Sequence, residues 1–357
     1  MRKTILAVLA FVTVATATFG AETEQKFGFN PESFEIRYFV QPRYSWFSGN
    51  VDIFDEKLGP GTDNSFGIRR SEVTLTSTVV PNTRGRLQLD VKPDKVEALD
   101  LYFEWTLPIH NRRPLSFTVG QFKKPFSYQE FVMASNNLNL IDRTFSNVFL
   151  EKKVLASSRD QGVMAAADLW EYGVPVLLNV GVFNGGGLGK KVDTNSGKQI
   201  VGRAEVTPLT GVSLGGSAEI NHRGYASDST QVKDYVVWGG DLVLARSGFQ
   251  LVAEVFGGDN SERFVSEGGA FPEAPTFLSW YAEAIYRAKS GWEPAVRFES
   301  FDPDRDSGND GRTILTGQIA YSLSPNFRWQ VNVAHQIFQD EAKDSLTGLY
   351  SQWTLRL

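Results

Sequence analysis

Apolar and polar residues alternate along most of this chain, in segments of about ten residues, the length of a membrane-spanning β-strand. The clearest segment is FEIRYFVQPRYSW, at positions 34–46. One face of it carries Phe34, Ile36, Tyr38, Val40, Pro42, Tyr44 and Trp46, and the other carries Glu35, Arg37, Gln41, Arg43 and Ser45. A period of two predicts a strand with one apolar face, because an amphipathic helix would repeat every 3.6 residues.

The same pattern predicts sixteen strands in all. They cover residues 34–47, 66–79, 84–92, 97–107, 115–122, 159–170, 174–184, 199–207, 212–221, 231–245, 249–256, 276–287, 293–301, 312–322, 326–338 and 348–357. The connections alternate between short segments rich in turn formers, such as PLTG and RSG, and longer loops, with PDKV the exception. Short turns at one end and long loops at the other are typical of an outer-membrane barrel. An even strand number places both termini on the short-turn, periplasmic side.

A soluble β-sandwich would also alternate, so the two faces have to be compared. The apolar face ends in aromatic residues such as Trp105, Trp280 and Trp353, as the girdles at a membrane interface require. The opposite face carries charges at mid-strand, such as Asp90 and Glu254. A sandwich core could not hold so many charges, whereas a water-filled lumen can. We therefore predict an all-β fold, a 16-stranded antiparallel transmembrane β-barrel.

Composition adds export to this picture. Arg2 and Lys3, an apolar run and small residues up to Ala21 are typical of a signal peptide, predicted at 1–21. Residues 22–33 are predicted to form a short periplasmic extension, and 34–357 a single barrel domain. The chain has no cysteine, which excludes disulfides and thiol chemistry. Its formal net charge of −5 makes nucleic-acid binding unlikely as a class, since such proteins are normally basic.

One connection breaks the regular plan. After GQF, at positions 120–122, come two lysines and Pro125, and no strand pattern resumes until Arg159. This is the longest connection, and loops of such length are usually functional or disordered. It contains enough apolar residues to pack against a wall. Its charged residues are Lys123, Lys124, Arg143, Lys152 and Lys153 against Glu130, Asp142 and Glu151.

The phrase GQFKKPFS, at positions 120–127, resembles the strand-to-loop hallmark of the phosphate-selective porin O and P family. Similar phrases occur in the same order at IRRSEVTL (68–75), VGVFNG (180–185), VGRAEVTP (201–208) and VRFESFDPD (296–304). The resemblance implies a sixteen-stranded, usually trimeric outer-membrane porin with an inward-folded loop and a row of basic residues that guide anions. It does not fix the solute, because the family has members that do not take phosphate. The loop after the fifth strand is the one that folds inward in general porins.

Basic side chains are the candidate site residues, because rings of lysine and arginine are the selectivity element expected of an anion pore. The loop supplies Lys123, Lys124, Arg143, Lys152 and Lys153. The lumenal faces supply Arg37, Arg43, Arg70, Arg203 and Arg297, with Arg86, Lys92, Arg287, Arg328 and Arg356 as further candidates. Two alternatives stay open: the loop lysines pair with Glu130 and Glu151, or the lumenal arginines form an ion-pair network with the acidic residues on the same faces.

The pattern favours a passive channel for small anions, phosphate-like solutes being the family's suggestion, in the bacterial outer membrane. Outer-membrane lipid and a homotrimer are the expected partners. The alternatives are a non-selective porin and a plugged structural or adhesive barrel. Three scattered histidines support no hydrolase, so we expect no enzyme activity. No cofactor is expected, and the Asp302, Asp304 and Asp306 spacing lacks the glycine and glutamate of a calcium loop.

Overall fold

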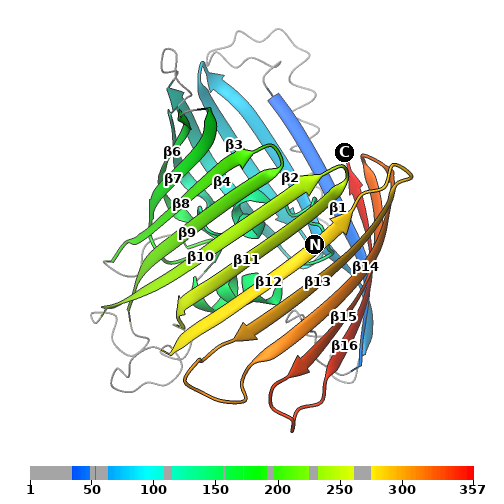
Figure 1. The fold of residues 1–357 in the computed structure, drawn as a ribbon. Coiled ribbons are helices and arrows are strands. Elements are labelled where there is room, and N and C mark those ends of the chain that lie inside the picture. The colour runs from blue at the N-terminus through cyan, green and yellow to red at the C-terminus, as the bar shows by residue number, and fades with distance from the viewer. Residues whose placement is uncertain are drawn as a thin grey trace.

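A computed structural model describes residues 34–48, 53, 63–107, 115–155, 157–171, 173–190, 197–224, 232–260 and 275–357. Within these ranges the chain forms one closed antiparallel barrel in which each strand pairs with its sequence neighbours (Figure 1). The barrel closes where the first strand pairs with the last, with Val40 opposite Leu355. The predicted signal peptide at 1–21 and the predicted extension at 22–33 lie outside the described residues.

The strands match the predicted ones, with ends shifted by three residues or fewer. They are β1 (Phe34–Phe47), β2 (Asn64–Val80), β3 (Thr83–Val91), β4 (Val96–Leu107), β5 (Leu115–Lys123), β6 (Arg159–Glu171), β7 (Val174–Phe183), β8 (Gln199–Leu209), β9 (Val212–Gly224), β10 (Val232–Arg246), β11 (Phe249–Asp259), β12 (Thr276–Tyr286), β13 (Trp292–Asp302), β14 (Arg312–Ser324), β15 (Phe327–Phe338) and β16 (Leu346–Arg356). The predicted 16-stranded fold is therefore confirmed.

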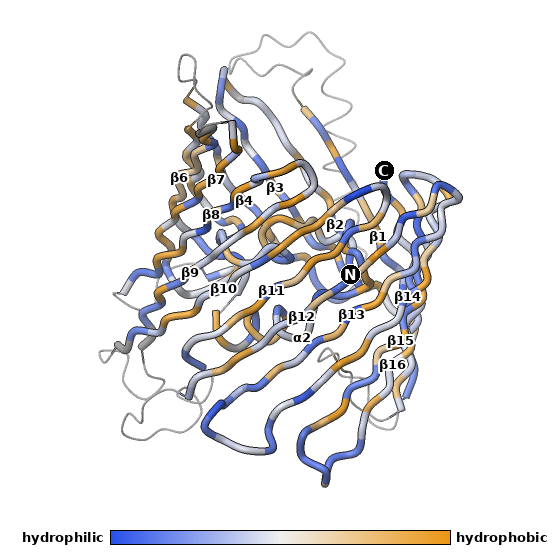
Figure 2. Tube along the Cα trace, in the orientation of Figure 1, coloured by the Kyte–Doolittle hydropathy of each residue, from blue (hydrophilic) through white to orange (hydrophobic). Residues whose placement is uncertain are grey.

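The two faces of the wall differ as the alternation requires. In β1, Gln41, Arg43 and Ser45 are buried on the inner face, while Val40 and Tyr44 point outward and stay partly exposed. Figure 2 shows the same alternation of hydrophilic and hydrophobic positions along the strands. Exposed apolar side chains such as Phe103 and Val180 cover the outside, where a bilayer would hide them from water.

A β-bulge interrupts this alternation between β1 and β2. Gln41 lies opposite Arg70, but the next residue, Pro42, lies opposite Ile68, so Arg69 is an extra residue in β2. Pro42 has no N–H to donate to a ladder, and proline is tolerated within a sheet at such bulges. Both Arg69 and Arg70 consequently reach inner-face partners.

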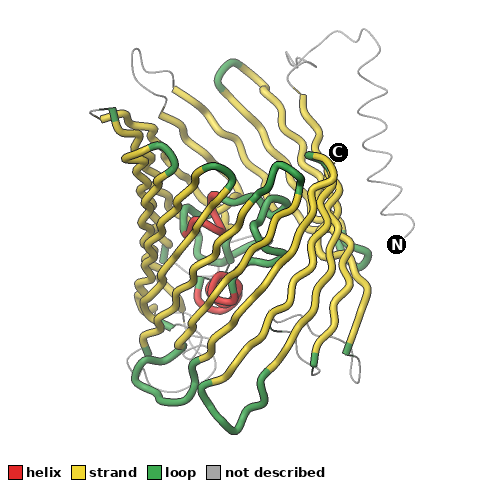
Figure 3. Tube along the Cα trace, turned by 45° about the vertical axis from the view of Figure 1, so that its right-hand side comes forward, coloured by secondary structure: helices red, strands yellow, loops and turns green. Residues whose placement is uncertain are grey.

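Three short helical segments lie between β5 and β6: η2 (Ser127–Val132), α2 (Phe145–Phe149) and η3 (Leu150–Val154). Figure 3 shows the helices within the ring of strands. Among the described residues, no helix has both the length and the apolar character needed to cross a bilayer.

Candidate pore constriction

The segment 124–158, called loop 3 below, contacts inner-face side chains around much of the barrel. It bonds to Ser217 of β9, Glu254 of β11, Arg297 of β13, Arg328 of β15 and Arg43 of β1. Contacts with strands on several sides of a closed barrel place loop 3 inside the lumen. Most of its side chains from position 138 to position 150 are buried.

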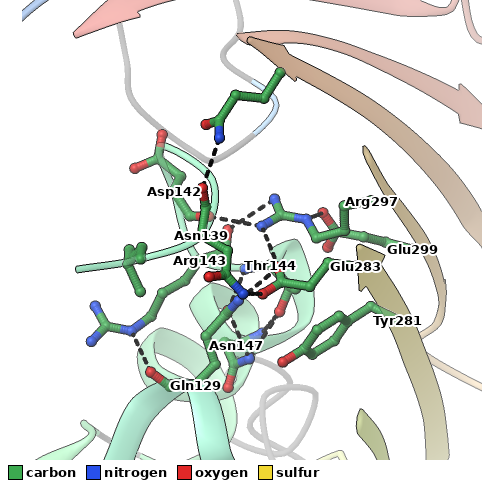
Figure 4. Close-up of polar contacts among 12 residues, drawn as sticks. Gln129, Asn139, Asp142, Arg143, Thr144, Asn147, Tyr281, Glu283, Arg297 and Glu299 are labelled. Carbon is green, nitrogen blue, oxygen red and sulfur yellow. Dashed lines mark hydrogen bonds and ion pairs between the residues drawn. The ribbon is translucent and has the colours of Figure 1, made fainter. Parts of the chain in front are cut away.

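An acidic patch on β11, β12 and β13 receives the N–H groups of loop 3. Glu254 lies opposite Tyr281, which lies opposite Glu299, and Glu283 lies opposite Arg297. These five neighbouring side chains are buried and are called the anchor patch below. Figure 4 shows that residues of loop 3, among them Gln129, Asn139 and Thr144, lie beside the Tyr281, Glu283, Arg297 and Glu299 members of this patch.

The carboxylates of the anchor patch hold the starts of two of the three helical segments, η2 and α2. Glu254 accepts bonds from the backbone N–H groups of Tyr128 (2.6 Å) and Gln129 (3.2 Å), and Glu299 accepts one from Phe145 (2.6 Å). Helix starts leave N–H groups without backbone partners and favour negative charge, so carboxylates stabilise them. Thr144 adds a side-chain cap to α2, since its hydroxyl accepts a bond from Asn147 N–H.

Arg297 binds a backbone carbonyl of loop 3 instead of an N–H group. Its Nη1 donates to the carbonyl of Asp142 at 2.8 Å, and its Nε forms an ion pair with Glu299 at 2.7 Å. Glu283 accepts a bond from the side-chain amide of Asn139 at 2.8 Å. The anchor patch therefore binds N–H groups through three carboxylates and a backbone carbonyl through one guanidinium. Every charge in it has a named partner, which is the condition for burying charges at tolerable cost.

On β1 and β2, an arginine cluster holds the Asp142 side chain of loop 3. Arg43 binds both carboxylate oxygens, each at 2.8 Å, and Arg69 binds one of them at 3.1 Å. Burial alone would raise the pKa of Asp142, but attraction to Arg43 and Arg69 outweighs it and holds that pKa far below its usual range. The two-pronged contact is the strong geometry of an arginine–carboxylate pair.

Open space remains beneath loop 3, on the side of β1–β6. A cavity of about 510 Å³ lies there, between the wall and residues 131–136. Its basic lining residues are Arg37, Arg86, Lys123, Arg159 and Arg356, and its acidic side chains are Glu72, Asp100 and Glu104. Several of these lie near the strand ends that are joined by short turns, so the cavity faces the predicted periplasmic side.

A pair of cations lines this cavity at the end of β5 and the start of β6, where the chain enters and leaves loop 3. Lys123 and Arg159 lie directly opposite each other on β5 and β6. Arg159 forms an ion pair with Asp100 at 2.8 Å. Lys123 donates to the carbonyls of Glu130 (2.6 Å) and Met133 (3.2 Å). Like charges facing each other on adjacent strands destabilise a sheet, so their placement here points to function.

Comparison with known proteins agrees with this architecture. The family model "Phosphate-selective porin O and P" matches residues 40–225. The chain belongs to this family. No curated protein sequence matches it. Membership and fold make the chain an outer-membrane porin, and they indicate a channel rather than an enzyme.

Solved structures similar to this porin are outer-membrane barrels. The outer-membrane channel DcaP of Acinetobacter baumannii has a TM-score of 0.61 at 12% identity, covering 94% of this chain and 100% of that one. OprB of Pseudomonas putida has a TM-score of 0.62 at 7% identity, covering 91% and 94%. OmpT of Vibrio cholerae, in a trimer form, has a TM-score of 0.58 at 8% identity, covering 91% and 100%. At these identities the likeness concerns the fold.

The predicted loop cations of the porin occupy different environments. Lys124 is buried, donates to the carbonyl of Leu155 at 2.8 Å and pairs with Glu219 of β9 at 3.3 Å. Arg143 pairs with Glu130 at 2.8 Å. Burial raises the pKa of Glu130, and Arg143 opposes that rise. Lys152 is exposed, and the side chain of Lys153 lies outside the described residues. Of this group, Lys123 lines the large cavity.

The predicted wall arginines are largely engaged in ion pairs. Arg203 pairs with Asp241 and Glu205, and the exposed Arg37 pairs with Glu35 at 2.6 Å. Arg43 and Arg297 bind loop 3 as described, while Arg70 donates to Gln41 at 3.1 Å. The ion-pair network, one of the two sequence-based alternatives, describes these contacts. The cations that line the large cavity are therefore a smaller set than the predicted one.

Two inward-facing cations, Arg69 and Arg159, escaped the sequence reasoning. Strict alternation allows only one of Arg69 and Arg70 to face inward, and the bulge opposite Pro42 brings in both. Arg159 shares the parity of the outward-facing Val163, so alternation assigns it to the lipid side. Gly120, at φ 134°, lies near the end of β5, and the facing Gly162 lies near the start of β6. Glycine permits a sharp change of direction at such positions. The sequence features that could have revealed these two exceptions to alternation are Pro42 and the pair of glycines.

Proposed function

We propose that this outer-membrane porin passes small anions by passive diffusion through the space between loop 3 and the wall of β1–β6. The observation that carries the proposal is the lining of the 510 Å³ cavity, where basic side chains outnumber acidic ones and Lys123 faces Arg159. The family's description suggests phosphate-like solutes. Cationic linings raise the local concentration of anions, and low-dielectric walls strengthen the effect.

Lys123 is the residue best suited to meet a passing anion. Its hydrogen bonds go to two backbone carbonyls, which carry only partial charges, whereas Lys124 and Arg143 each contact a carboxylate. A carbonyl leaves most of the ammonium's field intact, so an anion gains more from approaching Lys123. Binding at such a site is weak enough for release, which conduction requires.

A homotrimer in the outer membrane is part of the proposal. Support comes from the fold, which is shared with a protein solved in a trimer form. The outer faces of β15, β16, β1 and β2 carry polar contacts, Trp329 to Ser351 and Tyr38 to Ser71, on a surface otherwise rich in apolar side chains. Size measurement in detergent would test the assembly state.

The test of selectivity is the reversal potential in a planar bilayer under a KCl gradient. The wild-type potential is expected on the chloride side of zero, and Lys123→Glu is expected to move it toward potassium. The matched control is Lys343→Glu, the same charge change at an exposed residue of the loop after β15. A wild-type potential on the potassium side, or equal potentials for Lys123→Glu and Lys343→Glu, would refute the proposal. Absence of conductance steps would favour a plugged barrel.

A further inference from the structure

Loop 3 consists of two parts that differ in burial and attachment. Its body, anchored to the anchor patch and the arginine cluster, has buried side chains from Leu138 to Val148. Residues 131–137, called the rim below, are more open: Val132 is 46% exposed, and Ala134 and Asn137 are exposed as well. Phe131 and Val132 line the large cavity and also a second cavity of about 350 Å³ beside β6–β8. The rim therefore borders the open space on both sides.

The rim is held by few bonds. Ser135 donates its hydroxyl to both carboxylate oxygens of Glu72, at 2.9 Å and 3.2 Å. Within the described residues this is the one hydrogen bond between a rim side chain and a wall side chain. Lys123 and Arg356 bind the rim through its backbone carbonyls, at Met133 and Asn136.

Glu72 is well placed to act as the fixed end of this tie. It lies on β2, it is buried, and Gln88 of β3 donates to it at 2.6 Å, which sets the orientation of its carboxylate. The tie thus spans from the wall at β2 to a loop that leaves the wall at β5. It crosses the side of the lumen where the large cavity lies.

We propose that the rim is a gate, held in its constricting position by the hydrogen bond between Ser135 and Glu72 and able to move while the body of loop 3 stays in place. The proposal rests on the proposed channel function. Segments with exposed side chains and few buried contacts open at low free-energy cost, whereas the body would have to break buried charge contacts. Moving the rim joins the two cavities that Phe131 and Val132 now separate.

The bond to a charged acceptor sets the size of the expected effect. Losing a hydrogen bond to a charged acceptor is expected to change the ratio of tied to released rim by about tenfold or more. In single-channel recordings, Ser135→Ala is expected to raise the ratio of time in a larger-conductance state by about tenfold. The substitution adds and removes no charge, so the reversal potential is expected to change little.

Ser158→Ala is the matched control. Ser158 also donates to a carboxylate, that of Glu151 at 2.7 Å, but this bond lies within the base of loop 3 and does not reach the wall. Its removal is expected to leave the dwell-time ratio at the wild-type value. Equal ratios for wild type, Ser135→Ala and Ser158→Ala would overturn the gate, and so would equal increases in the two variants.

A cross-link provides the opposite perturbation. The chain has no cysteine, so Ser135→Cys with Glu72→Cys would place the only thiols of the protein at the two ends of the tie. Closing them with a short reducible thiol cross-linker is expected to abolish the larger-conductance state, and reduction is expected to restore it. Persistence of that state in the cross-linked protein would overturn the proposal.

Failure of the gate and failure of anion selectivity are distinguishable. A wild-type reversal potential on the potassium side, together with the dwell-time shift in Ser135→Ala, refutes selectivity and supports the gate. A chloride-side potential with unchanged dwell times does the reverse. A silent wild type with a conducting Ser135→Ala supports the gate in a barrel that is closed at rest, and silence in both overturns it.

Discussion

The bond between Glu254 and the start of η2 yields a quantitative prediction. Glu254→Gln keeps the shape of the side chain but replaces one acceptor oxygen with an NH2 group, which cannot accept a bond from an N–H. One oxygen of Glu254 accepts from Tyr128 N–H, while the other accepts from Ser127, Gln129 and Tyr281. The amide oxygen is expected to stay with the three donors, so Tyr128 N–H loses its partner.

The magnitude follows from the kind of bond lost. A hydrogen bond to a charged acceptor contributes about 1.5–3 kcal/mol, and a buried N–H without a partner costs a similar amount. We expect the local opening free energy of η2 to fall by about 2 kcal/mol. Since about 1.4 kcal/mol corresponds to tenfold, amide hydrogen exchange in residues 128–132 should quicken by roughly thirtyfold.

Hydrogen exchange with mass spectrometry on the detergent-solubilised protein measures this directly. Two variants serve as controls. Tyr281→Phe removes one donor to Glu254 and leaves the bonds to loop 3 in place, so it should change exchange in 128–132 far less. Glu205→Gln alters a lumenal carboxylate that pairs with Arg203. Unchanged exchange in Glu254→Gln, or quickening spread evenly over the barrel, would refute the reasoning.

Three further predictions concern the wall and the arginine cluster. The pKa of Asp142 is lowered in the folded protein, so its ion pairs stabilise the fold at every pH above its unfolded-state pKa, near 3.9, and are lost only as pH falls through the far lower folded-state pKa. Protection of loop 3 from proteolysis should therefore persist from pH 7 to pH 4. A loss of protection in that range would contradict this. Asp142→Asn should lower the free energy of unfolding at pH 7 by about 3–5 kcal/mol, the cost typical of a broken buried pair, and so lower the midpoint of urea unfolding; an unchanged midpoint would count against the cluster. Gly120→Ala should reduce heat-resistant barrel on gels, since a Cβ there would lie 2.3 Å from the Leu101 carbonyl; a normal yield would show that the wall adjusts.

The strands of this porin could be predicted from alternation alone because each wall position meets one of two very different solvents. Lipid outside and polar groups inside force a period of two that survives in every strand, so the ends of β1 and β6 were found closely. The site was harder. Which cation meets a carboxylate depends on side chains that lie far apart in the chain, such as Lys124 and Glu219 or Arg143 and Glu130.

Alternation did not predict which side chains face the lumen at positions where the backbone leaves the regular hydrogen-bond ladder of the sheet. Arg69 faces inward because of a bulge, and Arg159 reaches Asp100 near a strand end, so neither follows from counting positions in twos. The long lysine-led interruption was correctly located, but its anchoring partners on β11–β13 could not be inferred from sequence, because loop docking depends on three-dimensional register. The apolar residues of loop 3 indicated that it packs against something, and the structure shows where.

The anchoring of loop 3 also constrains the order of assembly. Its partners Glu254, Arg297 and Arg328 each lie more than a hundred residues after the loop residue that they bind. Contacts that close such long segments form late, because chain entropy must be overcome first. While the first strands insert, the loop's N–H groups must stay hydrated on the far side of an unfinished wall. The wall of the barrel is thus expected to form around an open lumen, and loop 3 to constrict that lumen in one of the last steps of folding.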